Sequence, residues 1–409
     1  MKNAIELVKD CESELTNNFK KIEEISLFNQ EKVLNALRNQ RLASRHFVQT
    51  NGYGYSDEGR EILARVYAEI FKAEDAIVSP FFACGSHAIS VVLYAILRPN
   101  DTMLAITGKP YDTLDEVIKG VSEDSGSLKD FGINYEQIDL INGEINTQAV
   151  LEYLKSKSPK LVFIQRSRGY SARNPLDCKK IADIISQIRQ INKEVFIVVD
   201  NCYGEFVQTT EPTEFGADIC VGSLIKNPGG GIAPTGGYVV GTKRAVDLVG
   251  KRLFSPSLGT ETGSYAGGYR LFFQGLFLAP HIVSQAVKGM MLLGAVATKL
   301  GFKIFPQTNE PHLDIIKSIE FNTKEELIDF CQLIQAYSPV ESYVKPEPWA
   351  MPGYTSEVIM AAGTFVQGAS IELSCDAPIR APYIIYIQGG LTYEHVKLVA
   401  IKMAEKFLK

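Results

Sequence analysis

The feature of this sequence that most restricts its fold is an alternation of short apolar runs with helical segments between residues 76 and 240. The runs at 102–106, 161–165 and 195–199 have the length and composition of buried strands, whereas 112–121 and 177–189 show helical spacing of apolar residues. Strands separated by helices of this size form βαβ units. The sequence therefore predicts an α/β fold built on a mostly parallel sheet.

The pattern changes on either side of this region. Residues 1–45 show apolar residues at helical spacing and predict a helical arm. A long apolar helix ends near Leu300, where Gly301 stops it. Beyond it we expect strands at 315–321, 371–374 and 383–388, a helix opened by a capping box at 323–326, and a last helix at 393–407. We therefore predict a large α/β domain at 46–300 and a smaller α+β domain at 301–409.

Composition excludes several classes of protein. The 409 residues carry a net charge of −5, which argues against nucleic-acid or anionic-membrane partners. No run of 18 apolar residues is free of charge, so no membrane span is expected. Seven cysteines without a CxxC spacing, and no histidine–carboxylate cluster, predict a reduced cytoplasmic protein with no metal site.

Two consecutive predicted strands end in residues of opposite charge. The run at 195–199 stops at Asp200, and the run at 219–221 is followed by Gly-Ser and then by Lys226. Because ligands of open α/β sheets bind beyond the carboxyl ends of the strands, both charges should face one cleft. Pyridoxal 5′-phosphate (PLP) needs this pair: a lysine to hold it as a Schiff base, and an anion to keep its pyridine nitrogen protonated.

Each residue also has an ordinary interpretation. A lysine beyond a strand is usually a solvated surface charge, and an aspartate there is usually a turn residue. The surroundings of Lys226 favour the cofactor instead, because Leu224, Ile225 and the glycines at 229–231 would desolvate the amine and allow close backbone approach.

A candidate phosphate site lies upstream. Gly85 and Ser86 stand where a strand meets a helix, and the free N–H groups of a helix N-terminus hold phosphate well. Ser223 could add a hydroxyl to the phosphate. A plain N-cap for Ser86 and a turn hydrogen bond for Ser223 remain alternatives. Tyr111 could stack on a flat ring, or could be a half-buried tyrosine.

These residues stand in motifs that resemble a known family. The segments NGYGYSDEGR (51–60), GSLIKNPGGGIAPTGGY (222–238), ELSCDAPIRAPY (372–383) and QGGLTY (388–393) are similar to fold-type I PLP enzymes of cysteine and methionine metabolism. The resemblance is strongest to the branch of methionine gamma-lyase-like or aluminium-resistance proteins. It implies the three-layer fold of the aspartate aminotransferase type.

The resemblance also implies roles for individual residues. Lys226 matches the Schiff-base lysine that also moves the substrate α-proton, and Asp200 matches the partner of the pyridine nitrogen. Gly85, Ser86 and Ser223 match the phosphate cradle. Tyr111 matches the tyrosine that stacks on the cofactor and assists the leaving group.

Three further residues match positions around the cofactor and substrate. Asn174 matches an asparagine beside the phenolic oxygen of the cofactor. Arg380 is the candidate clamp on the substrate carboxylate, a role that suits the forked guanidinium. Tyr55 matches a phosphate-binding tyrosine lent by a neighbouring subunit, which implies a homodimer or homotetramer with shared active sites.

The implied activity is a PLP-dependent carbon–sulfur lyase. It would act on a small sulfur-containing amino acid of the cystathionine or methionine type by β- or γ-elimination, releasing a thiol, a keto acid and ammonia. The chain departs from methionine-cleaving relatives at Asp57 and Thr113. Two alternatives stay open: another PLP reaction such as transamination or aldol cleavage, and a non-catalytic aluminium-resistance or stress protein that retains the fold.

Overall fold

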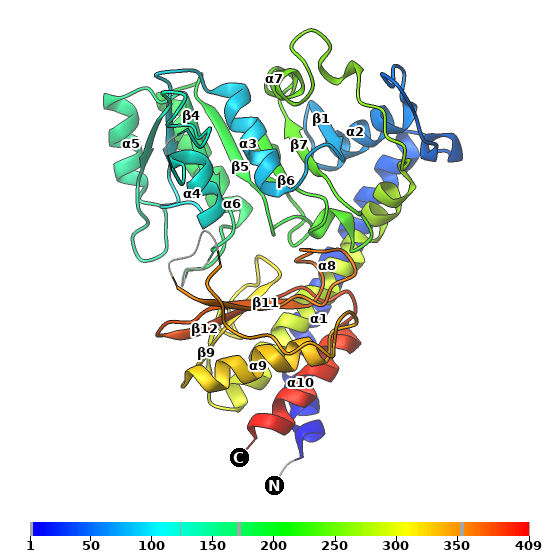
Figure 1. Ribbon diagram of the computed structural model, residues 1–409, viewed down its shortest axis with the longest axis vertical. Coiled ribbons are helices and arrows are strands. Elements are labelled where there is room, and N and C mark those ends of the chain that lie inside the picture. Colours follow the sequence, from blue (N-terminus) through cyan, green and yellow to red (C-terminus); the bar gives the residue numbers. More distant parts are fainter. Residues whose placement is uncertain (1–2, 123, 170–172, 352–355, 409) are drawn as a thin grey trace.

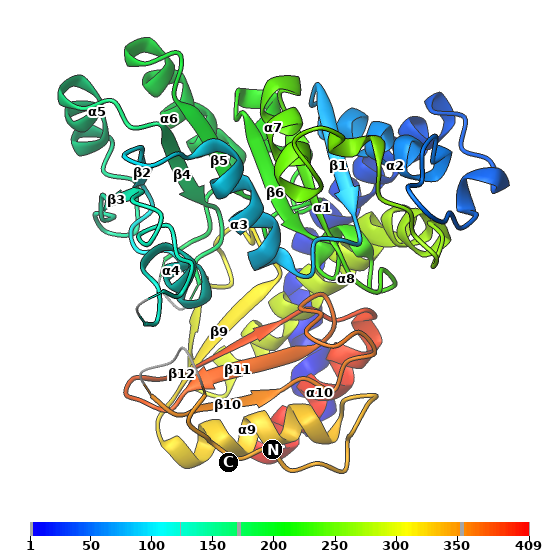
Figure 2. The ribbon, with the colours of Figure 1, turned by 45° about the horizontal axis from the view of Figure 1, so that its top comes forward.

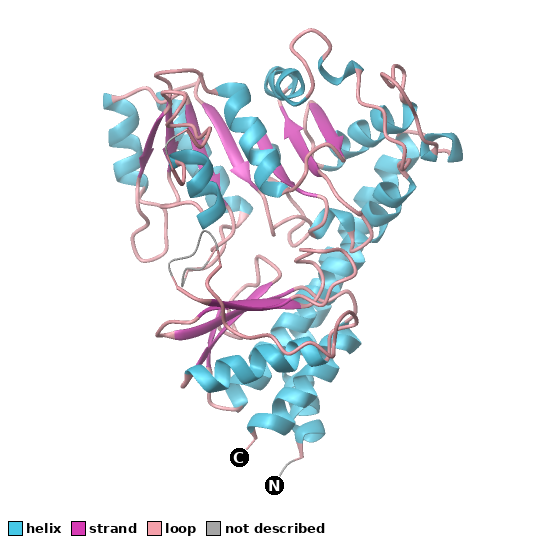
Figure 3. Cartoon of the chain, in the orientation of Figure 1, coloured by secondary structure: helices cyan, strands magenta, loops and turns pink. Residues whose placement is uncertain are grey.

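The computed structural model describes residues 3–122, 124–169, 173–351 and 356–408, and these form two β-sheets with helices around them (Figures 1 and 3). The larger sheet has seven strands in the order β1-β7-β6-β5-β4-β2-β3. All its neighbouring strands are parallel except β7, which is antiparallel to both β1 and β6. The strands are β1 (Asp75–Ser79), β2 (Thr102–Ala105), β3 (Asn134–Gln137), β4 (Leu161–Gln165), β5 (Phe196–Asp200), β6 (Ile219–Ser223) and β7 (Gly237–Gly241).

Helices cover both faces of this sheet. Successive side chains of each buried strand point to opposite sides, and because both sets are apolar, both faces need a covering layer. In β5, Ile197 and Val199 join one apolar core, whereas Phe196 and Val198 join the other. One face packs against α3 (Gly85–Ile96), α4 (Asp112–Lys119) and α7 (Lys243–Leu253). The other packs against α2 (Glu58–Ile70), α5 (Thr147–Ser156), α6 (Cys178–Ile191) and part of α8 (Arg270–Lys299). The predicted three-layer α/β fold is confirmed.

The second sheet is antiparallel and lies beneath the first in Figure 2. Its order is β10-β11-β12-β9-β8. One of its faces packs against helices, and the other faces the carboxyl ends of the parallel strands. The elements are β8 (Lys303–Phe305), β9 (Ile316–Phe321), α9 (Lys324–Ala336), β10 (Val358–Ala361), β11 (Ser374–Pro378), β12 (Tyr383–Gln388) and α10 (Tyr393–Phe407).

Two long helices connect the regions of the two sheets. Helix α1 (Ala4–Asn39) runs along α8, and both helices contact α10. By length and composition α8 could cross a membrane, but 67% of its most apolar window is buried inside the protein, as in the core helix of a globular fold. The domain boundaries at residues 45 and 300 stay a prediction.

The predicted elements agree with the structure except in a few places. The strand expected at 371–374 was wrong: β11 begins only at Ser374. The capping box at the start of α9 is only half formed. Thr323 accepts from the N–H of Glu326, but the Glu326 carboxylate accepts from Asn322 instead of Thr323. The short strands β3, β8 and β10 and the helix α7 were not predicted.

Candidate active site

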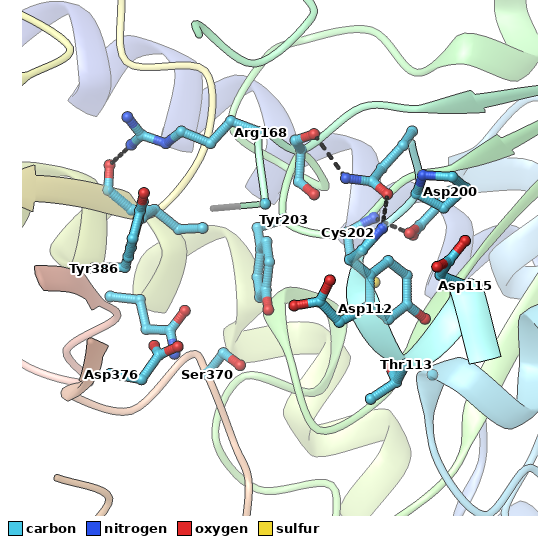
Figure 4. Close-up of a pocket in the computed structure, with 18 of the residues that line it drawn as sticks. Asp112, Thr113, Asp115, Arg168, Asp200, Cys202, Tyr203, Ser370, Asp376 and Tyr386 are labelled. Atoms are coloured by element: carbon cyan, nitrogen blue, oxygen red, sulfur yellow. Dashed lines mark hydrogen bonds between the residues drawn. The ribbon is translucent and has the colours of Figure 1, made fainter. Parts of the chain in front are cut away.

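A cavity of about 990 Å³ lies between the carboxyl ends of the parallel strands and the open face of the second sheet. Residues that follow β2, β4, β5 and β6 form one wall, and residues of β9 to β12 form the opposite wall (Figure 4). Of the predicted site residues, the cavity is lined by Gly85, Tyr111, Asp200, Lys226 and Arg380.

The structure brings Asp200 and Lys226 together. Asp200 ends β5 and is 3% exposed, while Lys226 follows β6 and is half-buried, with the cavity in front of it. The Lys226 ammonium lies 4.3 Å from the ring centroid of Tyr203, a cation–π contact. The alternative interpretation of Lys226 as a solvated surface charge is therefore excluded.

Electrostatics couple the two groups. Burial alone would lower the pKa of Lys226, but the neighbouring Cys202, Tyr203, Asp200 and Tyr111 raise it well above its usual value. Burial raises the pKa of the Asp200 carboxyl, and Lys226 opposes this rise. The Cys202 thiol and the Tyr111 phenol stay protonated near neutral pH, since burial raises the pKa of both. The Asp200 carboxylate is thus the anion that matches the Lys226 ammonium.

Asp200 is held in place by the chain that follows it. The backbone N–H of Cys202 donates to Asp200 Oδ1 at 3.2 Å. This short-range contact fixes the direction of a carboxylate that an isolated strand end would leave free. A group that must face one ring nitrogen needs such a fixed direction.

The predicted phosphate cradle is a close junction of two elements. Gly85 begins α3, and a Cβ atom built on it would lie 3.2 Å from Cβ of Ser223. Ser223 is 1% exposed, and its hydroxyl has no hydrogen-bond partner within the described residues. The turn hydrogen bond considered for Ser223 is therefore not formed there. Cys84, and not Ser86, is the N-cap, since its Sγ accepts from the N–H of His87.

Tyr111 is positioned by a residue that the sequence analysis missed. Its backbone N–H donates to Oε1 of Gln165 at 2.9 Å, and its hydroxyl lies 3.0 Å from Oγ of Ser86. Gln165 ends β4, so it occupies the same kind of position as Asp200. The rule that picked out Asp200, a polar side chain at the end of a buried strand, could also have found Gln165.

The three remaining predicted residues differ in their relation to the cavity. Tyr55 is 58% exposed, stacks on Tyr53 with 5.3 Å between ring centroids, and does not line the cavity. Asn174 borders the cavity-lining Arg173 but does not line the cavity itself, and its buried Oδ1 has no partner among the described residues. Arg380 is exposed at the cavity edge just beyond β11.

The wall formed by the second sheet was not predicted as part of the site. Met360, Asp376 and Tyr386 form one cross-strand row on its cavity face. Arg168 follows β4 and joins this wall to the large sheet, because its guanidinium donates to the carbonyl oxygens of Phe305 and Ile316 at 2.8 and 2.5 Å. Period-two spacing in β11 could have assigned Asp376 to a face. Nothing in the sequence said that this face meets the cleft.

Known proteins resemble the chain over nearly its full length. The protein YnbB of Bacillus subtilis (strain 168) is 47% identical over 391 residues, which cover 95% of this chain and 92% of YnbB. A crystal structure described as a carbon-sulfur lyase involved in aluminum resistance, from Clostridium novyi NT, superposes with a TM-score of 0.95 at 47% identity. That match covers 99% of this chain and 96% of the other.

More distant structures share the fold alone. The pyridoxal-5′-phosphate dependent protein YhfS from Escherichia coli is 16% identical and superposes with a TM-score of 0.63 over 94% of this chain and 97% of YhfS.

The family model described as methionine gamma-lyase matches residues 4–408. The chain therefore belongs to the methionine gamma-lyase family.

Proposed function

We propose that the protein is a PLP-dependent carbon–sulfur lyase acting on a sulfur-containing amino acid. The observation that carries this proposal is that a half-buried lysine, Lys226, and a buried carboxylate, Asp200, line the same cavity. The family and the similarity to a carbon-sulfur lyase support the same reaction class.

The residues fit the cofactor by their donor chemistry. The buried Ser223 hydroxyl has no partner among the described residues, and it lies beside Gly85, where a Cβ atom would be in tight contact with Ser223. This close approach of the two elements suits a phosphate group. Lys226 would hold the cofactor covalently, and Asp200 would hold the proton of the ring nitrogen. Asn174 offers a buried amide oxygen without a partner among the described residues. When bound, PLP supplies an electron sink for the bonding electrons at the substrate α-carbon.

The remaining roles follow from position. Lys226, freed by the incoming amino group, would take the proton from the substrate α-carbon. Tyr111, placed by Gln165, would pack against the cofactor, and its hydroxyl could protonate the departing sulfur. Arg380 would bind the substrate carboxylate from the cavity edge. Together these groups would release a thiol, a keto acid and ammonia.

The exposed Tyr55 extends the proposal to the assembly. Its ring and that of Tyr53 lie outside the cavity of their own chain. We propose that a second copy of the chain receives Tyr55 at its phosphate site, so that a homodimer is the smallest active unit. Size-exclusion chromatography with light scattering, on wild type and Tyr55→Ala, tests this assembly. The cofactor affinity of the same two proteins tests whether Tyr55 contributes to the phosphate site.

The central experiment combines cofactor absorbance with product analysis. Lys226→Ala should lose the visible absorbance of the lysine-bound cofactor, whereas Lys109→Ala, a change of another cavity-lining lysine, should keep it. Wild type should release keto acid, ammonia and thiol from cystathionine, methionine, homocysteine or cysteine. Retention of the band by Lys226→Ala would refute the covalent role. Bound cofactor without any keto acid would favour the non-catalytic alternative, and keto acid without a thiol would favour another PLP reaction.

A further inference from the structure

The Lys226 ammonium lies against the face of one aromatic ring. Its distance of 4.3 Å from the ring centroid of Tyr203 is the shortest cation–π contact among the described residues, where the other such distances run from 5.0 to 6.0 Å. Both residues line the cavity and both are half-buried. A cation gains more from a ring face in partly desolvated surroundings than in open water. The ring of Tyr203 therefore favours the charged form of the Lys226 amine.

Tyr203 is held in place by the segment that carries the lysine. The side-chain amide of Asn227, the residue after Lys226, donates to the carbonyl oxygens of Tyr203 and Glu205 at 2.9 and 3.0 Å. Asn227 is 0% exposed, so water does not compete for these hydrogen bonds. The backbone of Tyr203 therefore keeps a fixed position relative to the backbone of Lys226.

The turn that carries the ring is held from its other side as well. The N–H of Gly204 donates to the carbonyl oxygen of Asn201 at 2.8 Å, and the Arg166 guanidinium donates to Oδ1 of Asn201 at 2.8 Å. Asn201 and Arg166 are both buried. Figure 4 shows the ring of Tyr203 between the two walls of the cavity. A well-supported turn thus presents this ring to Lys226.

The other groups around Lys226 have a different role or carry no charge. The neighbours that raise its pKa are Cys202, Tyr203, Asp200 and Tyr111. Asp200 is assigned above to the ring nitrogen of the cofactor, and the Cys202 thiol and the Tyr111 phenol stay protonated near neutral pH. The face of the Tyr203 ring therefore remains to attract a charged Lys226 amine during the reaction.

We propose that Tyr203 is a positioning residue that stabilises the ammonium form of Lys226 and directs its amine during proton transfer. The inference rests on the lyase function proposed above. In that reaction the C–H bond at the substrate α-carbon breaks, an N–H bond forms at Nζ of Lys226, and the bonding electrons stay with the substrate. The ring attracts the ammonium more strongly than the neutral amine, so its attraction grows as the proton arrives and lowers the barrier.

The geometry is tested first by NMR on the protein without cofactor. With the lysines labelled with carbon-13 at Cε, the signal that disappears in Lys226→Met belongs to Lys226. The ring current of Tyr203 should shift the Cε-bound protons of Lys226 upfield of the average lysine signal. Tyr203→Phe should keep this shift because it keeps the ring, whereas Tyr203→Leu should abolish it. Tyr386→Leu, which removes a ring from the opposite wall of the cavity, should leave the shift in place.

Proton transfer is tested second, on the PLP-loaded enzyme. L-Alanine has an α-proton but no leaving group, so the exchange of this proton in deuterated water reports the step at Lys226 without elimination. Tyr203→Leu should slow the exchange about two- to thirtyfold, the effect of losing one cation–π contact, whereas Tyr203→Phe should stay close to wild type. The loss should appear in kcat with KM almost unchanged, because the ring acts on Lys226 and not on the bound amino acid.

Four results would overturn the proposal. They are a Lys226 signal without an upfield shift in wild type, an upfield shift that survives in Tyr203→Leu, exchange in Tyr203→Leu as fast as in wild type, and slow exchange in Tyr203→Phe. The last result would mean that the hydroxyl acts and not the ring face. If Tyr203→Leu does not fold, the shift in wild type and the exchange rate of Tyr203→Phe still decide the matter.

Failure of the lyase function would be distinguishable from failure of this inference. If alanine exchanges its α-proton but no sulfur-containing amino acid is cleaved, the lyase proposal falls, and the exchange rates of the two Tyr203 variants still decide the role of the ring. If wild type exchanges no α-proton either, the role in proton transfer falls too, and the upfield shift alone decides whether Tyr203 holds the ammonium of Lys226.

Discussion

The charge pairing of Asp200 and Lys226 can be measured without cofactor by a double-mutant cycle on the apoprotein. Asp200→Asn keeps the shape of the side chain and an oxygen that can accept from the N–H of Cys202, but it removes the negative charge. The Lys226 ammonium then remains in the cavity with the ring of Tyr203 and without the carboxylate. We expect the free energy of unfolding to fall and the pKa of Lys226 to fall with it.

The size of the effect follows from burial. Removing one partner of a buried ion pair costs about 3–5 kcal/mol. Asp200 is 3% exposed, but Lys226 keeps access to the cavity and attracts Asp200 through space without a direct ion pair. We therefore expect a smaller loss, about 2 kcal/mol, as for charges several ångströms apart at an effective dielectric constant of about 20. Asp112→Asn breaks a 3.5 Å pair with Lys109 whose side chains are 38% and 52% exposed. Such a pair contributes at most about 1 kcal/mol, which makes it the matched control.

Urea unfolding followed by circular dichroism measures these energies. Asp200→Asn, Lys226→Met and the double variant should be compared with wild type, all without cofactor. Because the double variant removes both charges, it should lose less free energy of unfolding than the two single variants lose in sum. The difference should be at least about 1 kcal/mol. The coupling of the two charges would be refuted if the decreases in the free energy of unfolding were strictly additive. It would also be refuted if Asp200→Asn lowered this free energy no more than Asp112→Asn does.

Two further predictions concern buried polar groups near the site. Burial raises the pKa of Glu205 to about 8 from an ordinary value near 4.5. The folded protein therefore binds more protons than the unfolded chain between these pH values, and its stability should fall as pH rises through that window. Urea midpoints at pH 5 and pH 8 should differ less in Glu205→Gln than in wild type; an equal difference would contradict this assignment. Ser223→Ala removes a buried hydroxyl without a partner among the described residues, so the apoprotein should be as stable as wild type or more stable. The same change should weaken PLP binding about tenfold in a fluorescence titration, and unchanged affinity would remove Ser223 from the phosphate site.

The sequence by itself determined the parallel sheet and the charged pair of the site. The bounds of β4 at 161–165 and of α10 at 393–407 agree with the structure, because strand and helix periodicity are local properties of the chain. Asp200 and Lys226 could be placed in one cleft because parallel strands end at the same edge of a sheet. That rule needs only the chain direction of two neighbouring strands.

Only the tertiary structure decided what faces this pair. Asp376 and Tyr386 reach the cavity because the second sheet presents one face to the strand ends of the first, an arrangement that involves residues 150 or more positions apart in the sequence. The pKa of Lys226 likewise could not be predicted, since it depends on the balance between burial and the groups of two separate segments, 200–203 and Tyr111. Local patterns specify which side chains an element carries, whereas long-range packing decides which of them meet.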